Sequence, residues 1–212
     1  MKNKSLRPLN KLEQRYICQF IRILIPIARD DHHSMRGIAR WQIALAMWRW
    51  TADAVDIRSG KVRKDAFEYN VDFRRHTQGA RDALAASTSA KGLRHEHMVP
   101  RSILADEIMK RDMDENNIYH FLCKWCHAVI VTKKEDSKIR PRTRMPDDGN
   151  FSTGKLDRRY KDAGLKKKIR KPLGLKSNMA DPRAGIAANW MAEICLPHGD
   201  PAPRSRSPAR SQ

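Results

Sequence analysis

The sequence predicts a mixed α+β protein with a mainly helical amino-terminal region, and three observations lead to that prediction. Apolar residues recur every three or four positions over 11–28 and 38–57, which is the spacing of an amphipathic helix. Residues 128–132 form an unbroken Ala-Val-Ile-Val-Thr run, which favours a strand. The small-residue segment "ASTSAKG" has the composition of a linker. It divides a helical region over 1–90 from a second region over 91–176.

The amino-terminal region is expected to contain three helices. The first covers 11–28 and carries an apolar stripe that includes Tyr16 and Phe20. Pro26 should end or kink this helix, because proline has no backbone N–H to donate to the helical ladder. The third is expected over 64–86.

The second helix, over 38–57, has the clearest apolar stripe of the three. Tryptophans at helical spacing usually pack in a core, so we expect this stripe to face the core rather than to stack on bases. The same helical region is a candidate surface for a protein partner or for a second copy of the chain. The stripe consists of Trp41, Leu45, Trp48, Ala52 and Val55.

Three further segments complete the chain. Residues 133–176 are rich in Lys and Arg and lack strong periodicity, which indicates a basic arm lying along a polyanion. Residues 177–198 are expected to hold a short helix, in which Pro182 suits the first turn. Residues 199–212 are rich in Pro, Ser and Arg and are expected to be disordered.

The composition points to a polyanionic partner. The chain has 212 residues with 43 Lys and Arg against 24 Asp and Glu, which gives a net charge of +19. Such a surface binds nucleic acid, because phosphate contacts release counterions. No apolar run reaches membrane-spanning length, and four cysteines are too few and too scattered for a secreted disulfide framework. We therefore expect a cytoplasmic, reduced protein that binds DNA, with RNA as the alternative, and no membrane.

Two segments of the second region carry side chains with catalytic chemistry. His95-Glu96-His97 combines an oxygen ligand for a divalent cation with a base that titrates near neutral pH. Thr132 is followed three residues later by Glu135, a capping-box pattern that predicts a helix directly after the strand. The expected order is strand, long connection, strand and short helix.

These residues resemble a divergent branch of the small HNH-type nucleases of the ββα-metal superfamily. The resemblance rests on "RHEHMVPRSIL" and "AVIVTKKED", and "RRYKDAGL" at 158–165 is similar to a segment found downstream in such proteins. It covers about 93–165 and does not extend to the amino-terminal region. It implies a small ββα-metal core and an endonuclease that hydrolyses phosphodiester bonds of DNA. The implied cofactor is a divalent metal, Mg²⁺ or Mn²⁺, with Zn²⁺ as the alternative.

The resemblance also implies roles for individual residues. His97 would be the general base that activates water. Glu96 would bind the metal from the first strand and Asp136 from the helix, with Glu135 as a lower-ranked metal ligand. His95 is expected to be a flanking polar residue or to orient the site.

A second register of the motif stays open. "NNIYHFLCKWCHAVIVT" also aligns with the commoner HNH pattern, in which Asn117 would orient the base and His127 would bind the metal. That register places a helix at 128–132, against the strand preference of those residues. It also usually accompanies a second Cys pair, and the chain has none before His95. Cys123-x-x-Cys126 is therefore either half of a zinc site or a pair of small, partly buried side chains.

The expected function is thus a metal-dependent DNA endonuclease, in a setting such as phage defence or restriction. The alternatives are a basic nucleic-acid-binding protein without catalysis and a nuclease toxin that acts on RNA or DNA. The basic side chains expected to contact the phosphates are Arg94, Arg101, Lys133, Lys134, Arg140, Arg142 and Arg144.

Overall fold

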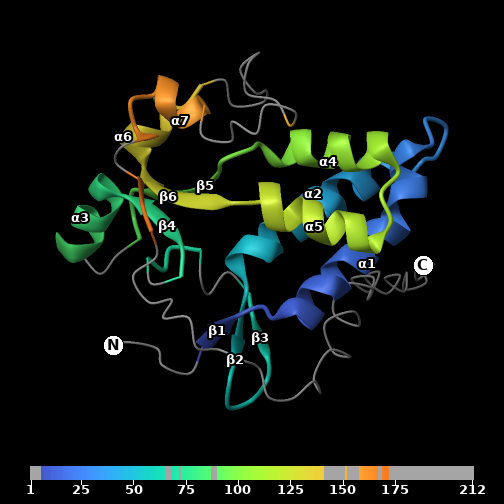
Figure 1. The fold of residues 1–212 in the computed structure, drawn as a ribbon, viewed down its shortest axis with the longest axis horizontal. Helices are drawn as coiled ribbons and strands as arrows, with labels where there is room; N and C mark the ends of the chain where they lie inside the picture. The colour runs from blue at the N-terminus through green and yellow to red at the C-terminus, as the bar shows by residue number, and fades with distance from the viewer. Residues whose placement is uncertain are drawn as a thin grey trace, which may run out of the picture.

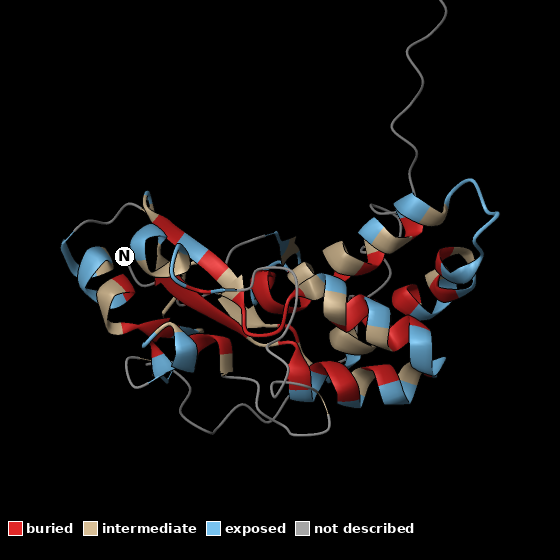
Figure 2. Cartoon of the chain, turned by 90° about the horizontal axis from the view of Figure 1, so that it is seen from above, coloured by how far each residue is buried: buried red, intermediate tan, exposed pale blue. Residues whose placement is uncertain are grey.

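The computed structural model describes residues 6–64, 68–71, 73–86, 90–140, 151, 158–166 and 169–171. It shows a mixed α+β fold in which a group of four helices stands beside a four-stranded sheet, with a small three-stranded sheet next to both (Figure 1). Buried residues run along the strands and the inward faces of the helices (Figure 2). The predicted α+β class is confirmed.

The four-helix group holds most of the hydrophobic core. It consists of α1 (Lys11–Arg29), α2 (Arg36–Ala52), α4 (Arg101–Arg111) and α5 (Glu115–Trp125). Isoleucines from all four helices meet in its centre and are fully buried. The last two helices come from the connection between the two motif strands. The amino-terminal region and the second region therefore share one core.

Helix α1 begins at a complete capping box and runs past its proline. The Asn10 side chain accepts a hydrogen bond from the backbone N–H of Glu13, whose carboxylate accepts one from the backbone N–H of Asn10. The helix continues for three residues beyond Pro26 and ends at Arg29. The helix was predicted to end or kink at the proline, and it does not end there; Pro26 removes one backbone donor from the ladder, and the helix continues past it.

Of the predicted stripe, Ala52 and Val55 are buried, but helix α2 otherwise turns a different face to the core. Ile43, Met47 and Trp50 lie in the core, whereas Trp41 is 60% exposed and Trp48 is only partly buried. Apolar residues occupy most of the circumference of this helix, so helical spacing alone does not decide which stripe faces inward.

The small sheet and the start of the large one replace much of the predicted third helix. In the small sheet, β1 (Leu6–Pro8) and β3 (Val62–Arg63) flank β2 (Ala54–Asp56), and both pairs are antiparallel. Helix α2 therefore ends five residues earlier than expected. The described part of 64–77 consists of turns and β4 (Arg75–Thr77), and only α3 (Gln78–Ala86) is helical. The prediction of a helix over 64–86 is wrong in its first half, where strand pairing overrides a weak apolar periodicity.

The large sheet has the strand order β5-β6-β4-β7. Strands β5 (Leu93–His97) and β6 (Ala128–Thr132) are antiparallel, with Leu93 opposite Thr132 and His97 opposite Ala128. Strand β4 pairs parallel to β6, and β7 (Ile169–Arg170) closes the sheet. Helix α3 covers one face of β5 and β6, and α7 (Arg158–Asp162) covers the other.

The predicted order of strand, connection, strand and short helix is confirmed. Helix α6 (Lys133–Asp136) begins directly after β6, with the capping box between Thr132 and Glu135 formed in both directions. The strand over 128–132 is the secondary structure that the Asp136 register requires.

No helix among the described residues combines the length and the apolarity needed to cross a bilayer. The predicted helix over 177–198, the tail over 199–212, most of the basic arm, and Arg142 and Arg144 lie outside the described residues.

Candidate functional site

Strand β5 points the residues of its motif to opposite sides of the sheet. Side chains alternate along a strand, so His95 and His97 share the face of Leu93, while Glu96 shares the other face with Arg94. The two histidines therefore face α2, and Glu96 faces α7. The base and the strand ligand that the resemblance implies are not brought onto one face.

His97 is held by a hydrogen bond to the end of α2. Its ring is 4% exposed, and its Nε2 lies 3.1 Å from the hydroxyl oxygen of Thr51. That hydroxyl also lies 3.0 Å from the carbonyl oxygen of Trp48, and the backbone of Met47 is a second hydrogen-bond partner of His97. Burial, followed by the neighbouring His95 and Arg101, lowers the pKa of His97 well below its usual value. His97 is thus a neutral side chain with a structural partner.

His95 is equally buried but has no such partner. The ring is 6% exposed, and neither ring nitrogen has a hydrogen-bond partner among the described residues. The ring packs edge-on against Trp48, with centroids 4.4 Å apart. Burial, followed by the charges of Arg74 and Arg101, lowers its pKa to about 3. An unsatisfied buried imidazole is costly to the fold, which makes it a candidate for contact with a ligand.

Glu96 forms an ion pair with a buried arginine from α7. The Arg159 guanidinium, 0% exposed, donates to the Glu96 carboxylate at 3.0 Å and to the carbonyl oxygen of His97 at 3.1 Å. The Tyr160 hydroxyl donates to the backbone carbonyl of Glu96 at 3.4 Å. Burial, and then the charge of Glu96, raises the pKa of Tyr160 well above its usual range, and Asp136 adds to the shift. The carboxylates of Glu96 and Asp136 therefore both raise the pKa of the Tyr160 phenol.

The two acids of α6 have different environments. Glu135 accepts hydrogen bonds from the Thr77 hydroxyl at 2.7 Å and from the backbone N–H of Thr132 at 2.9 Å. This carboxylate caps its helix and ties α6 to β4, as the capping-box pattern predicts. Asp136 is partly buried on the same short helix.

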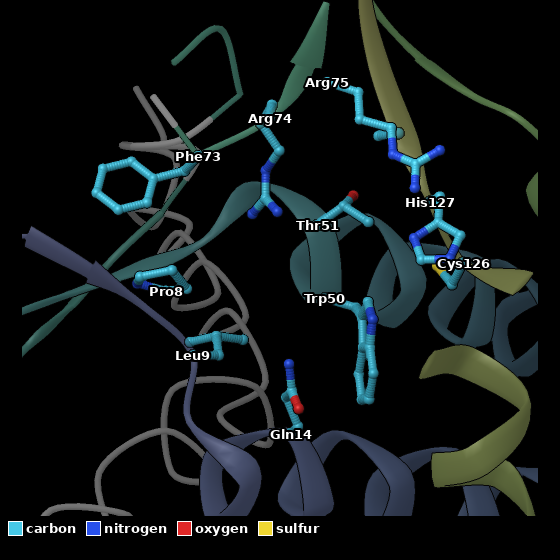
Figure 3. A pocket seen from close by; sticks show the side chains of 11 residues that line it. Pro8, Leu9, Gln14, Trp50, Thr51, Phe73, Arg74, Arg75, Cys126 and His127 are labelled. Carbon is cyan, nitrogen blue, oxygen red and sulfur yellow. The ribbon is translucent and has the colours of Figure 1, made fainter. Parts of the chain in front are cut away.

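The residues of the alternative register do not line the hollow of the histidine pair, although the backbone carbonyl of His127 accepts a hydrogen bond from the N–H of Met98 at 2.8 Å. Asn117 is exposed in the first turn of α5, and His127 precedes β6 rather than lying on a helix. His127 lines a separate hollow together with Arg74, Arg75 and Thr51, as Figure 3 shows. Burial, and then the charge of Arg75, lowers the pKa of His127.

The two cysteines of the Cys-x-x-Cys pair differ in exposure. Cys123 is exposed, whereas Cys126 is buried with its Sγ 3.6 Å from the carbonyl oxygen of Met47. Burial raises the pKa of the Cys126 thiol to about 12. Cys126 is thus one of the small, buried side chains that the sequence allows for, and Cys123 is not.

Two hollows meet over Trp48. A hollow of about 320 Å³ is lined by residues that include Trp48, His95, Glu96, His97 and Arg101. A second hollow, of about 290 Å³, shares Trp48 and Arg101 with the first and extends along α2. We call the two together the Trp48 groove; the second hollow adds Trp41 and Leu45 to its lining.

Of the basic residues of the prediction, only Arg101 lines the Trp48 groove. Arg101 lies with its guanidinium carbon 5.0 Å from the centroid of the Trp48 ring. The others are all exposed on β5, on α6 or just after it: Arg94, Lys133, Lys134 and Arg140.

The donor groups do not form a metal-binding set within the described ranges, where no three His, Cys, Asp or Glu side chains cluster tightly enough to hold an ion. Glu96 is engaged by Arg159, and Glu135 is engaged by its cap. The described residues as placed do not fit the implied divalent metal.

Four residues of this site were not predicted from the sequence. They are Trp48 as a groove wall, Thr51 as the partner of His97, and Arg159 and Tyr160 as the partners of Glu96. For the last two, the only signal was their place in the segment 158–165.

Comparisons of the chain with protein-family models, with curated proteins and with solved structures found no match.

Proposed function

We propose that the chain binds nucleic acid and hydrolyses its phosphodiester bonds in the Trp48 groove. The observation that carries the proposal is His95, an almost fully buried imidazole whose nitrogens lack partners among the described residues, in a hollow that also contains Arg101. The net charge of +19 favours a polyanionic substrate. DNA is the expected substrate, and RNA offers the same phosphodiester group.

His95 takes the role that the resemblance assigns to His97. Both ring nitrogens of His95 are buried beside the hollow, so the proposed reaction requires the bound substrate to admit a water to one of them. That neutral nitrogen can then accept a proton from the water as its oxygen attacks phosphorus. The P–O bond to the leaving sugar oxygen then breaks, that oxygen takes a proton from water, and the imidazolium of His95 releases its proton to the solvent. Arg101 would hold the phosphate through charge-assisted hydrogen bonds.

The resemblance implies a divalent metal, and Asp136 remains the candidate ligand on the helix. Because the described donor groups form no ligand set, we assign no step to a metal. The cleavage experiment therefore also tests whether activity depends on Mg²⁺ or Mn²⁺.

Cleavage of plasmid DNA tests the proposal. The full chain is incubated with supercoiled plasmid in Mg²⁺, in Mn²⁺ and in EDTA, and the nicked and linear products are separated on a gel. We expect His95→Ala to lose at least roughly 100-fold in cleavage rate, because a general base contributes that much or more. Plasmid binding should persist. The control is His32→Ala, an exposed histidine remote from the groove. Equal cleavage by His95→Ala and His32→Ala would contradict the assignment.

Two further variants address the metal. Asp136→Asn tests the helix ligand of the favoured register, and His127→Ala tests that of the alternative register. A metal-dependent activity that is lost in Asp136→Asn and retained in His127→Ala would support Asp136 as the metal ligand on the helix.

Binding without hydrolysis is the second candidate function. It is favoured by the contacts of the two implied catalytic residues, since His97 is bonded to Thr51 and Glu96 to Arg159. Retention of plasmid by the wild-type chain, with no product under any metal condition, would support this candidate.

A further inference from the structure

The aromatic stripe of α2 lies on the outside of the helix group. Trp41 is 60% exposed, and Leu45 and Trp48 are partly covered, while the opposite side of the helix packs in the core. Residues 41, 45 and 48 follow helical spacing, so their side chains form one continuous row. This row lines the Trp48 groove from its outer end to His95. The exposed Trp41 ring therefore offers a face to a ligand, whereas the Trp48 ring is already contacted by Arg101 and His95.

An arginine lies along the same groove without a carboxylate partner. Arg101 donates to the carbonyl of Ala44 at 3.0 Å and stacks over the Trp48 ring. It forms no ion pair within the described part of the chain. Its guanidinium is thus held in place by a neutral acceptor and a ring, and its charge is available to an anion. The arginines of α2, by contrast, pair with Asp31, Asp106 and Asp53.

We propose that the Trp48 groove binds the unpaired bases of a single-stranded nucleic acid, which stack on Trp41 while Arg101 contacts the backbone phosphate. The proposal rests on the proposed function for the choice of nucleic acid as ligand, and it adds the strand state of the substrate. Aromatic rings beside a fixed cation are the chemistry that recognises single strands.

We expect a single strand rather than a duplex because of the part of the base that the groove can contact. In a duplex, the faces of the bases are covered by their neighbours, and only their edges and the phosphates are accessible. An exposed tryptophan ring needs a free base face to stack on. Trp41 and Trp48, the latter in ring contact with His95, are seven residues apart on α2, roughly 10 Å along the helix axis. A short stretch of unpaired strand can therefore stack on Trp41 and place a phosphate next to His95.

Charge favours this ligand over a protein or a second copy of the chain. A chain with a net charge of +19 repels its own copies, and the fixed guanidinium of Arg101 at the groove calls for an anion. A nucleic-acid strand supplies both the flat apolar surface and the negative charge.

Binding measurements in EDTA test the proposal without any contribution from metal-dependent cleavage. Fluorescence anisotropy reports the binding of a labelled single strand of roughly 20 nucleotides, and of the same strand paired with its complement. DNA and RNA strands are both used, and a preference for either single strand over its duplex supports the proposal. The variants are Trp41→Ala and Trp41→Phe. Ile38→Ala is the matched control, because Ile38 is an exposed apolar residue of α2 that does not line the groove.

We expect Trp41→Ala to weaken single-strand binding by roughly 5- to 100-fold, the range for loss of one stacked base. Duplex binding should stay unchanged, and Trp41→Phe should retain part of the affinity. A wild-type preference for duplex, or equal single-strand affinities for Trp41→Ala and Ile38→Ala, would overturn the proposal. Sedimentation velocity adds a separate outcome: a wild-type dimer that dissociates in Trp41→Ala would identify the groove as a self-association surface and also overturn it. Intact single-strand binding with no cleavage under any condition would contradict the proposed hydrolysis and leave the binding proposal standing.

Discussion

The ion pair between Glu96 and Arg159 should make a large contribution to stability, and Glu96→Gln measures it. The substitution keeps the shape of the side chain and removes its charge, which leaves a fully buried guanidinium without its carboxylate. Removing one partner of a buried pair costs about 3–5 kcal/mol. The Glu96 side chain is 26% exposed, so water screens part of the interaction, and we expect a loss near the lower limit, about 3 kcal/mol.

A double-mutant cycle separates the pair from its surroundings. The free energy of unfolding is measured by urea denaturation, followed by tryptophan fluorescence, for Glu96→Gln, Arg159→Met and the double variant. We expect a coupling energy of about 1–3 kcal/mol, because Arg159→Met removes the charge that Glu96→Gln leaves unpaired. Asp106→Asn is the control, since its ion pair with Arg40 is exposed and should contribute less than about 1 kcal/mol. If Glu96→Gln costs no more than that control, or if the two single effects add, the reasoning about this pair is wrong.

Three further predictions concern buried polar groups. Thr51→Val should lower the free energy of unfolding by about 1–3 kcal/mol, because it leaves the buried Nε2 of His97 without the Thr51 hydroxyl, and Thr51→Ser should restore most of it. The pKa of His95 is about 3 in the folded chain and 6.5 ordinarily, so the unfolded chain binds the extra proton, and stability should fall as pH drops below 6.5. Urea denaturation at pH 7 and pH 5 should show a loss of about 2 kcal/mol from this residue that is absent in His95→Gln. Burial raises the pKa of Cys18 and Cys126 to about 12, so peptide mapping after iodoacetamide treatment should find both alkylated only once the chain unfolds.

Local signals predicted the elements that carry the motif. Strand β6 is formed by a β-branched run, and helix α6 begins at the capping box between Thr132 and Glu135. Both features depend only on residues within one short segment, so they can be predicted from the sequence of that segment. The order of strand, strand and short helix followed from these two features.

The surroundings of the motif could not be predicted in the same way. Thr51 is 46 positions from His97, and Arg159 is 63 positions from Glu96, so tertiary packing alone decides that they meet. Trp41 and Trp48 have the spacing of a core stripe, and only the packing of α2 against α1 and α4 shows that another stripe is buried. His95 and His97 look equivalent in sequence. What distinguishes them is a hydroxyl supplied by a distant helix.

The helices α4 and α5 between β5 and β6 have a consequence for how the chain folds. Pairing of β5 with β6 must close a loop that contains both helices. The chain entropy lost in closing this loop is offset only when the hydrogen bonds between the two strands form. Ordering α4 and α5 against α1 and α2 shortens the effective loop, because the packed helices bring Pro100 and Cys126 to the same end of the helix group. Assembly of the helices should therefore precede pairing of the motif strands. A fragment limited to the second region would have to form its hairpin without the helices on which α4 and α5 pack.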